Sequence, residues 1–154
     1  GIYSQKISNF NELKDGATIA IPNDATNGGR ALMLLERAGI LKLKEGVGIT
    51  ATVNDIAENP KNVQITELEA AMLPRMLQDF DAAVINTNYV LEAKIDPESA
   101  IFRENSDSPY ANIIVVREGD ENRPEVKKLV ETLQSDDVKK FIQDKYGAAV
   151  VPAF

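Results

Sequence analysis

Short apolar runs rich in isoleucine and valine alternate with helical patterns along this chain. The runs lie at residues 17–21, 63–68, 82–85 and 113–117, each bounded by polar or turn residues. Nearly continuous apolar strands separated by helices are typical of an α/β protein with a mostly parallel sheet. We therefore predict that these segments are strands and that helices flank the sheet they form.

Helical periodicity predicts the elements between the strands. The first helix is expected over residues 27–38, with an apolar stripe that ends at Gly39. Shorter helices are expected after Asn54, ending at Asn59-Pro60, around residues 74–78, and near 89–93. Residues 94–109 show little periodicity and read as a long surface connection.

Two further helices are predicted at the end of the chain. Pro124 suits the first turn of one, Ser135 suits the cap of the other, and Gly147 suits its end. Each helix carries one apolar stripe, and both stripes are expected to face a core: Val126, Leu129, Val130 and Leu133 on the first, and Val138, Phe141 and Ile142 on the second.

The junction between the first strand and the first helix is a candidate anion site. A helix N-terminus has unpaired N–H groups and a partial positive charge, so it attracts a carboxylate. Arg30, one turn into the helix, adds a fork that can bind a carboxylate through two hydrogen bonds, and Thr26 or Asn27 can cap the helix. The alternative is that Asn23, Asp24, Thr26 and Asn27 are simply turn and cap residues, with Gly28-Gly29 easing a tight corner and Arg30 solvated.

A second strand–helix junction repeats this theme. The run 82–85 delivers Asn86, Thr87, Asn88 and Tyr89 to the start of a helix. In open α/β sheets, ligands bind beyond the carboxyl ends of the strands, so the two junctions are expected to face one site. The alternative for such asparagines is that they only satisfy neighbouring backbone groups.

Composition excludes several kinds of chemistry. The chain has no histidine and no cysteine, which excludes a Cys/His zinc site, a thiol nucleophile and a Ser-His-Asp triad. Its net charge is −7, and its basic residues are scattered, so nucleic acid is not an expected partner. The pairs Glu67 with Glu69 and Asp79 with Asp81 offer carboxylates, but nothing supplies a nucleophile with its base. We therefore expect no cofactor and no metal, and we do not expect an enzyme.

Several segments together carry a family resemblance. They are Gly1-Ile2-Tyr3-Ser4, the stretch from Ile21-Pro22-Asn23-Asp24 to Arg30-Ala31-Leu32, Leu68-Glu69-Ala70-Ala71-Met72-Leu73-Pro74-Arg75, Ala82-Ala83-Val84-Ile85-Asn86-Thr87-Asn88-Tyr89, Pro109-Tyr110-Ala111-Asn112, and the tail Val150-Val151-Pro152-Ala153-Phe154. Taken in this order, the sequence resembles the NlpA-type methionine-binding lipoproteins, the substrate-binding components of methionine ABC importers.

The resemblance implies a type II periplasmic-binding-protein fold that closes on free methionine and delivers it to a membrane permease. It implies that Arg30 binds the carboxylate of the amino acid. Asn88, Asn112 and Asn86 are the implied polar contacts to the carboxylate or amino group, with Asn27 and Tyr110 as further candidates. Another amino acid or a short peptide is the alternative ligand.

The resemblance also implies how the chain is divided. Residues 1–8 correspond to a strand that crosses between two lobes, 9–109 to one complete lobe, and 110–154 to a return strand and helices that belong with the other lobe. By this resemblance, we expect the first part of that other lobe, the signal sequence and the lipid anchor of the family to be missing from these 154 residues. We therefore expect an extracytoplasmic, lipid-anchored parent. In this chain the stripes on Val126 to Leu133 and Val138 to Ile142 are expected to lack their natural sheet, so that it self-associates, swaps segments or pairs with a separately supplied N-terminal piece.

Overall fold

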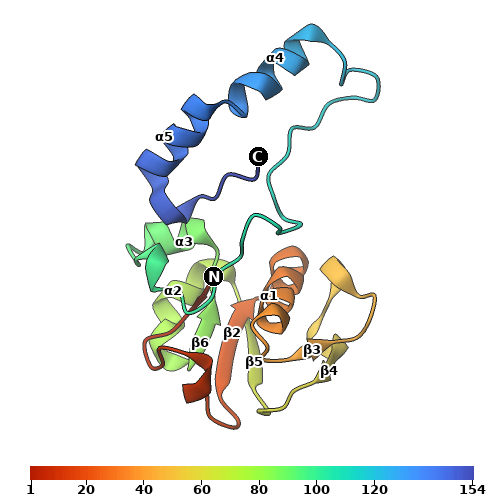
Figure 1. The fold of residues 1–154 in the computed structure, drawn as a ribbon. Helices are drawn as coiled ribbons and strands as arrows, with labels where there is room; N and C mark the ends of the chain where they lie inside the picture. Colours follow the sequence, from red (N-terminus) through yellow and green to blue (C-terminus); the bar gives the residue numbers. More distant parts are fainter. The chain divides into compact units, whose positions relative to one another are not determined.

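In the computed structural model, the chain divides into two units, Gly1–Glu104 (unit 1) and Asn105–Phe154 (unit 2) (Figure 1). The structure describes residues 1–154, apart from the side chain of Ala148. No helix among the described residues is long and apolar enough to cross a membrane. Each unit is described by itself below.

Unit 1 is organised around a four-stranded sheet with the order β1-β6-β2-β5. Its strands are β1 (Ile2–Tyr3), β2 (Thr18–Pro22), β5 (Gln64–Leu68) and β6 (Ala82–Val84). β2 runs parallel to both β5 and β6, with Ile19 opposite Ile65 and Ala82, while β1 is antiparallel to β6. The three strands predicted in this unit and the mostly parallel sheet are confirmed.

Helices cover both faces of this sheet. Successive residues of β2 point to opposite sides, and its apolar residues are buried on both. Ile19 and Ile21 pack with Leu32 and Leu35 of α1 (Ala25–Arg37) on one face. On the other face, Ala20 packs among residues of α2 (Leu73–Met76) and α3 (Thr87–Glu92). Short 3₁₀ turns precede and follow α2, at Ala70–Met72 and Leu77–Asp79. The helices predicted near 74–78 and 89–93 therefore exist, each starting slightly earlier.

The first helix begins at Ala25, two residues before the predicted start, and its apolar stripe is buried as expected. It ends where Gly39 adopts a φ of 73°, a conformation that favours glycine. Gly28 and Gly29 lie inside the helix, so they do not form a tight corner. A Cβ on Gly29 would lie 2.7 Å from the carbonyl oxygen of Ile49, which shows that this glycine permits close packing of the 3₁₀ turn Gly48–Thr50 against α1.

The helix predicted after Asn54 is wrong. Val53–Asp55 is a single 3₁₀ turn, and β4 (Ile56–Glu58) follows it directly and pairs antiparallel with β3 (Lys42–Leu43). The carboxylate of Asp55 accepts hydrogen bonds from the backbone N–H and hydroxyl of Thr52, which closes the turn after three residues. Pairing with β3 then favours extended backbone over a second helical turn.

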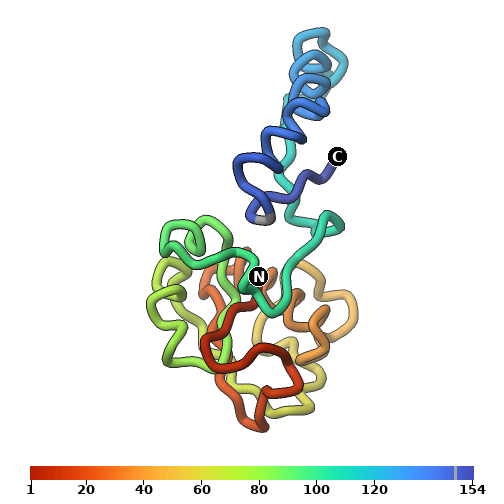
Figure 2. The backbone as a smooth tube through the Cα atoms, turned by 60° about the vertical axis from the view of Figure 1, so that its left-hand side comes forward, coloured from red at the N-terminus to blue at the C-terminus, as the bar shows by residue number. Residues whose placement is uncertain are grey.

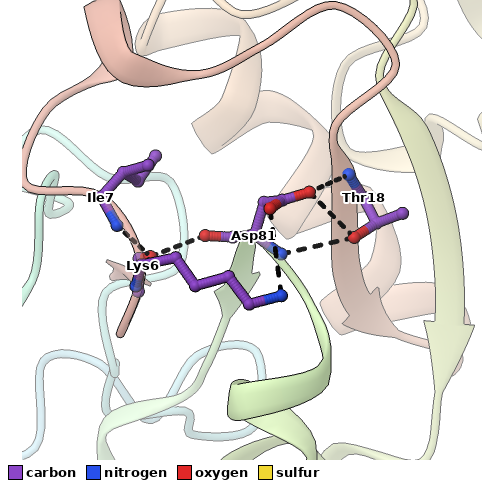
Figure 3. A network of polar contacts seen from close by, with 5 residues as sticks. Lys6, Ile7, Thr18 and Asp81 are labelled. Atoms are coloured by element: carbon purple, nitrogen blue, oxygen red, sulfur yellow. Dashed lines mark hydrogen bonds and ion pairs between the residues drawn. The ribbon is translucent and has the colours of Figure 1, made fainter.

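The amino-terminal edge of the sheet is held by a polar network around Asp81 (Figure 3). The backbone N–H of Thr18 donates to Asp81 Oδ2 at 2.8 Å, and the Thr18 hydroxyl donates to the same oxygen at 3.1 Å. Ser4 Oγ donates to the Asp81 carbonyl at 2.6 Å and accepts the N–H groups of Lys6 and Ile7. These bonds join the starts of β2 and β6 to the segment after β1.

The segment predicted as a surface connection is partly built into the sheet. After the 3₁₀ turn Pro97–Ser99, the N–H of Ile101 donates to the carbonyl of Ile2, and the N–H of Ile2 donates to that of Phe102, both at 2.8 Å. This bridge extends the pairing of β1. Figure 2 follows the backbone from β6 through α3 to this return beside the N-terminus.

Unit 2 contains α4 (Pro124–Leu133) and α5 (Asp136–Tyr146), followed by the 3₁₀ turn Gly147–Ala149. Both predicted helices are confirmed. Pro124 lies in the first turn of α4, Ser135 accepts the N–H of Val138 as the cap of α5, and Gly147 ends α5 with a φ of 51°.

In unit 2 the predicted strand is wrong, and the helix stripes meet the expectation that they lack a covering sheet rather than the expectation that they face a core. Residues 113–117 form no strand, and Ile113 and Val115 are 79% and 78% exposed. The described residues of this unit include no other strand with which they could pair. The apolar stripes of α4 and α5 do not face a core: neither helix has a buried residue among those described, and Leu129, Leu133 and Phe141 are exposed. Without a sheet in the unit, the stripes have nothing large to pack against.

Candidate functional site

The two predicted strand–helix junctions meet at the carboxyl edge of the sheet in unit 1. β2 and β6 are parallel neighbours, so the residues after Pro22 and after Val84 emerge at the same edge. Asn86 Nδ2 donates to Asn27 Oδ1 at 2.9 Å across this edge. The hydrogen bond joins the start of α3 to the start of α1.

The cap of α1 agrees with the alternative that counted Asp24 among the turn and cap residues, and not with a cap at Thr26 or Asn27. Asp24, and neither Thr26 nor Asn27, is the N-cap: its Oδ1 accepts the backbone N–H of Asn27 at 3.0 Å. The side-chain amide of Asn27 donates to both Asp24 oxygens, also at 3.0 Å. These bonds, the backbone one foremost, lower the pKa of Asp24. The helix terminus is thus already paired with a carboxylate of the chain, which weakens it as a site for a second anion.

Arg30 lies on α1 one turn beyond Asn27 and is bound by a carboxylate rather than solvated. Its Nε donates to Glu104 Oε1 at 2.7 Å, and its Nη2 donates to Glu104 Oε2 at 2.5 Å. The two side chains are 34% and 19% exposed, respectively. This bidentate geometry is the one that a guanidinium uses to hold any carboxylate.

Glu104 reaches Arg30 because of the return of the chain beside β1. Ile2 is opposite Val84 at the carboxyl end of β6, and Phe102 is bridged to Ile2. The residues that follow Phe102 are therefore delivered to the same edge as Asn86 and α1. Arg30, Asn27, Asn86 and Glu104 thus form the candidate site, and all of them belong to unit 1.

Three other residues were predicted to contact a ligand. Asn88 is exposed in the first turn of α3. Tyr110 is half-buried, and its backbone N–H donates to Ser108 Oγ at 3.2 Å. Asn112 is exposed in backbone that forms neither helix nor strand. Tyr110 and Asn112 belong to unit 2.

The sequence did not predict Glu104, and it offered Asp24 as a turn or cap residue only in the alternative to an anion site. The position of Asp24, three residues before Asn27, is a usual signal for an N-cap, and it identifies the helix start. No comparable signal marks Glu104, because it lies 74 positions from Arg30 in a stretch with little periodicity. Only the pairing of β1 with residue 102 brings it to the site.

The two acidic pairs that offered carboxylates for catalysis, Glu67 with Glu69 and Asp79 with Asp81, are not part of the candidate site. Asp81 is hydrogen-bonded to Thr18 at the opposite, amino-terminal edge of the sheet, and Glu67, Glu69 and Asp79 are exposed. Among the described residues, no group of three or more acidic side chains is placed to hold a metal ion. The carboxyl edge therefore offers a hydrogen-bonding and ion-pairing site made from amides, one guanidinium and carboxylates.

Comparison with known proteins identifies the family. The sequence profile described as NlpA lipoprotein matches residues 1–154. The chain belongs to the NlpA lipoprotein family. Similar NlpA family sequences include the D-methionine-binding lipoprotein MetQ of Escherichia coli K12, which is 50% identical over 139 residues, covering 88% of this chain and 51% of MetQ. Lipoprotein 28 of the same organism is 43% identical over 155 residues, covering 99% of this chain and 57% of that protein.

Solved structures of similar proteins show the same fold. A nutrient-binding protein from Burkholderia cenocepacia, determined bound to methionine, has a TM-score of 0.83 and is 51% identical; the match covers all of this chain and 66% of that one. The expected periplasmic-binding-protein fold is thus confirmed for this NlpA family chain. The chain spans about half the length of the curated relatives it matches.

Proposed function

We propose that this chain is part of the extracytoplasmic substrate-binding component of an ABC importer for methionine. The observation that carries the proposal is the Arg30 guanidinium at the carboxyl edge of the sheet, already bound bidentately to a carboxylate. The same fork fits the carboxylate of an amino acid. The choice of methionine rests on relatives named for methionine binding and on the methionine-bound Burkholderia cenocepacia structure.

The asparagines at this edge differ in what they can offer a ligand. The amide of Asn27 is engaged by Asp24 on one side and by Asn86 on the other, which supports a structural role. Asn86 donates through Nδ2, and no donor among the described residues meets its Oδ1, so this oxygen suits a ligand ammonium. Asn88, Asn112 and Tyr110 remain proposed ligand contacts on the strength of the family resemblance.

The remaining assignments follow from the proposed role. The protein acts as a binding protein and not as an enzyme, outside the cytoplasmic membrane, where a lipid anchor on the parent holds it near its permease. Residues 9–109 then correspond to one lobe of the binding protein, with 1–8 crossing between lobes and 110–154 belonging with the other lobe.

The exposed apolar residues of unit 2 support a further part of this proposal. Ile113, Val115 and Phe141 are more than half exposed, and surfaces of this kind usually bind a partner. We propose that they are covered by self-association, by segment swapping, or by an N-terminal piece supplied separately.

Isothermal titration calorimetry with L-methionine tests the function. It is run on the 154-residue chain and on a hybrid in which the part of the Burkholderia cenocepacia protein that this chain does not match is joined to it. Binding by the hybrid alone would indicate that the site requires the additional residues. Failure of both to bind methionine, with binding of another amino acid or a short peptide, would replace the proposed ligand.

Substitution of Arg30 tests its role. Arg30→Ala is expected to cost about 2–4 kcal/mol of binding free energy, because a charged partner of the ligand carboxylate is lost. Arg75→Ala is the matched control, since Arg75 is an exposed arginine on α2. Equal methionine affinity in the Arg30→Ala and Arg75→Ala variants would refute the assignment.

A further inference from the structure

The candidate site pairs its cation with an acidic side chain of the same unit. Both oxygens of Glu104 accept hydrogen bonds from Arg30, so the charges of the two side chains cancel locally. The Glu104 side chain is only 19% exposed, which limits how far water can screen its charge. An anion that approaches Arg30 therefore also meets a fixed negative charge.

We propose that Glu104 makes the Arg30 site select zwitterionic amino acids over simple carboxylates. The proposal rests on the proposed function, in which Arg30 binds the ligand carboxylate. A carboxylate without an amino group brings one uncompensated negative charge toward Glu104. An amino acid brings the same carboxylate together with an ammonium group, for which Glu104 is a favourable neighbour.

The backbone holds Glu104 in place for this role. Residues 101 and 102 lie shortly before Glu104 in the chain, and two hydrogen bonds of 2.8 Å join them to Ile2. Ile2 is itself fully buried and paired with β6. These bonds fix the backbone shortly before Glu104, which keeps its carboxylate within reach of Arg30 and of a ligand bound there.

Other charged side chains lie near the pair. Arg103 directly precedes Glu104 in the chain. The carboxylate of Asp24 lies at the start of α1, where it is engaged by Asn27.

The test compares methionine with 4-(methylsulfanyl)butanoate, which is methionine without its amino group. Dissociation constants for both are measured by calorimetry on the 154-residue chain and on the hybrid described above. In Glu104→Gln the preference for methionine is expected to fall about tenfold, because a partly buried charge is removed while a hydrogen-bonding group remains. Glu45→Gln, at an exposed turn, is the control with the same change of charge and is expected to keep the preference.

The ratio of the two affinities separates selectivity from structural damage. A merely structural role for Glu104 would weaken both ligands together and leave the ratio unchanged, and an unchanged ratio in Glu104→Gln would overturn the proposal. Glu104→Asp retains the charge and is expected to retain the preference.

A measurement on the unsubstituted protein keeps the test decisive if Glu104→Gln fails to fold. The ligand is 2-hydroxy-4-(methylsulfanyl)butanoate, which can still donate a hydrogen bond at the position of the amino group but has no positive charge. Rejection comparable to that of the des-amino acid supports the proposal. Methionine-like affinity for the hydroxy acid would overturn it.

The outcomes also separate this inference from the proposed function. If methionine binds but the ratio of the two affinities is unchanged in Glu104→Gln, the selectivity proposal is refuted and the proposed function is retained. If methionine does not bind but another amino acid does, and its des-amino counterpart is rejected in a Glu104-dependent way, the ligand assignment fails and the selectivity stands. If no amino acid binds the hybrid, both fail.

Discussion

Replacement of Gly29 by alanine has two opposing effects on the free energy of unfolding: a gain in helix propensity and a steric cost. In the interior of a helix, alanine is favoured over glycine by about 1 kcal/mol. At this position, however, the added Cβ would lie 2.7 Å from the carbonyl oxygen of Ile49 and 3.2 Å from that of Ala51. Both contacts are with backbone, so relief requires the 3₁₀ turn Gly48–Thr50 to move away from α1.

The cost of such overpacking is about 1–3 kcal/mol. Strain exceeds the propensity gain over most of this range, so Gly29→Ala is expected to lower the free energy of unfolding by up to about 2 kcal/mol. The matched control is Gly28→Ala, where the nearest atom to the new Cβ is the Pro22 carbonyl oxygen at 3.1 Å. There, the milder contact and the helix propensity are expected to cancel approximately.

Urea unfolding followed by circular dichroism measures both variants against the unsubstituted chain. Hydrogen exchange of the β2 amides reports on unit 1 separately from unit 2. A Gly29→Ala variant at least as stable as the unsubstituted chain would show that the turn yields freely and that close packing does not explain the glycine.

Three further predictions concern stability and association. Hydrogen bonds from Thr18, the backbone one foremost, lower the pKa of Asp81, so its contribution is present above the unfolded-state pKa and is lost as pH falls through the folded pKa. Asp81→Asn is therefore expected to lower the melting temperature at pH 7, and to lower it less at pH 3. Thermal melts of the variant and the unsubstituted chain at both pH values would measure this, and an equal difference in melting temperature at both would contradict it. Asp24→Ala is expected to cost about 1 kcal/mol by loss of the α1 cap, measured by urea unfolding, whereas no loss would show that water replaces the cap. Phe141→Ser is expected to change stability by less than about 0.5 kcal/mol because the ring is largely exposed, and to reduce self-association in light scattering; a monodisperse unsubstituted chain at high concentration would refute the proposed association.

A contact in the candidate site could be predicted where both of the residues that make it follow the ends of neighbouring strands. The apolar runs that became β2 and β6, with Asn27 and Asn86 after them, sufficed to bring these asparagines to one edge, and the structure joins them by a hydrogen bond. Arg30 was identified from its place one helical turn further on. Its partner was not, because Glu104 is positioned by a strand bridge between residues far apart in the sequence.

The failed predictions share a dependence on neighbours. The segment after Asn54 has a short helical pattern, but pairing with β3 makes its end a strand. Conversely, residues 113–117 have the composition of a buried strand and form none, since strand structure requires a hydrogen-bonding partner. The stripes of α4 and α5 likewise show which face of each helix is apolar without showing what covers it.

The sequence by itself determined the local features of this protein: the strands of the parallel sheet, the helices and their ends at Gly39 and Gly147, and the polar junctions at the carboxyl edge. These follow from periodicity and backbone preference, which act over a few residues. Only the tertiary structure decided that Gly29 admits a neighbouring turn and that Glu104 neutralises Arg30. Each of these depends on which groups compete for the same space or the same hydrogen bond, and that competition is settled only when the chain has folded.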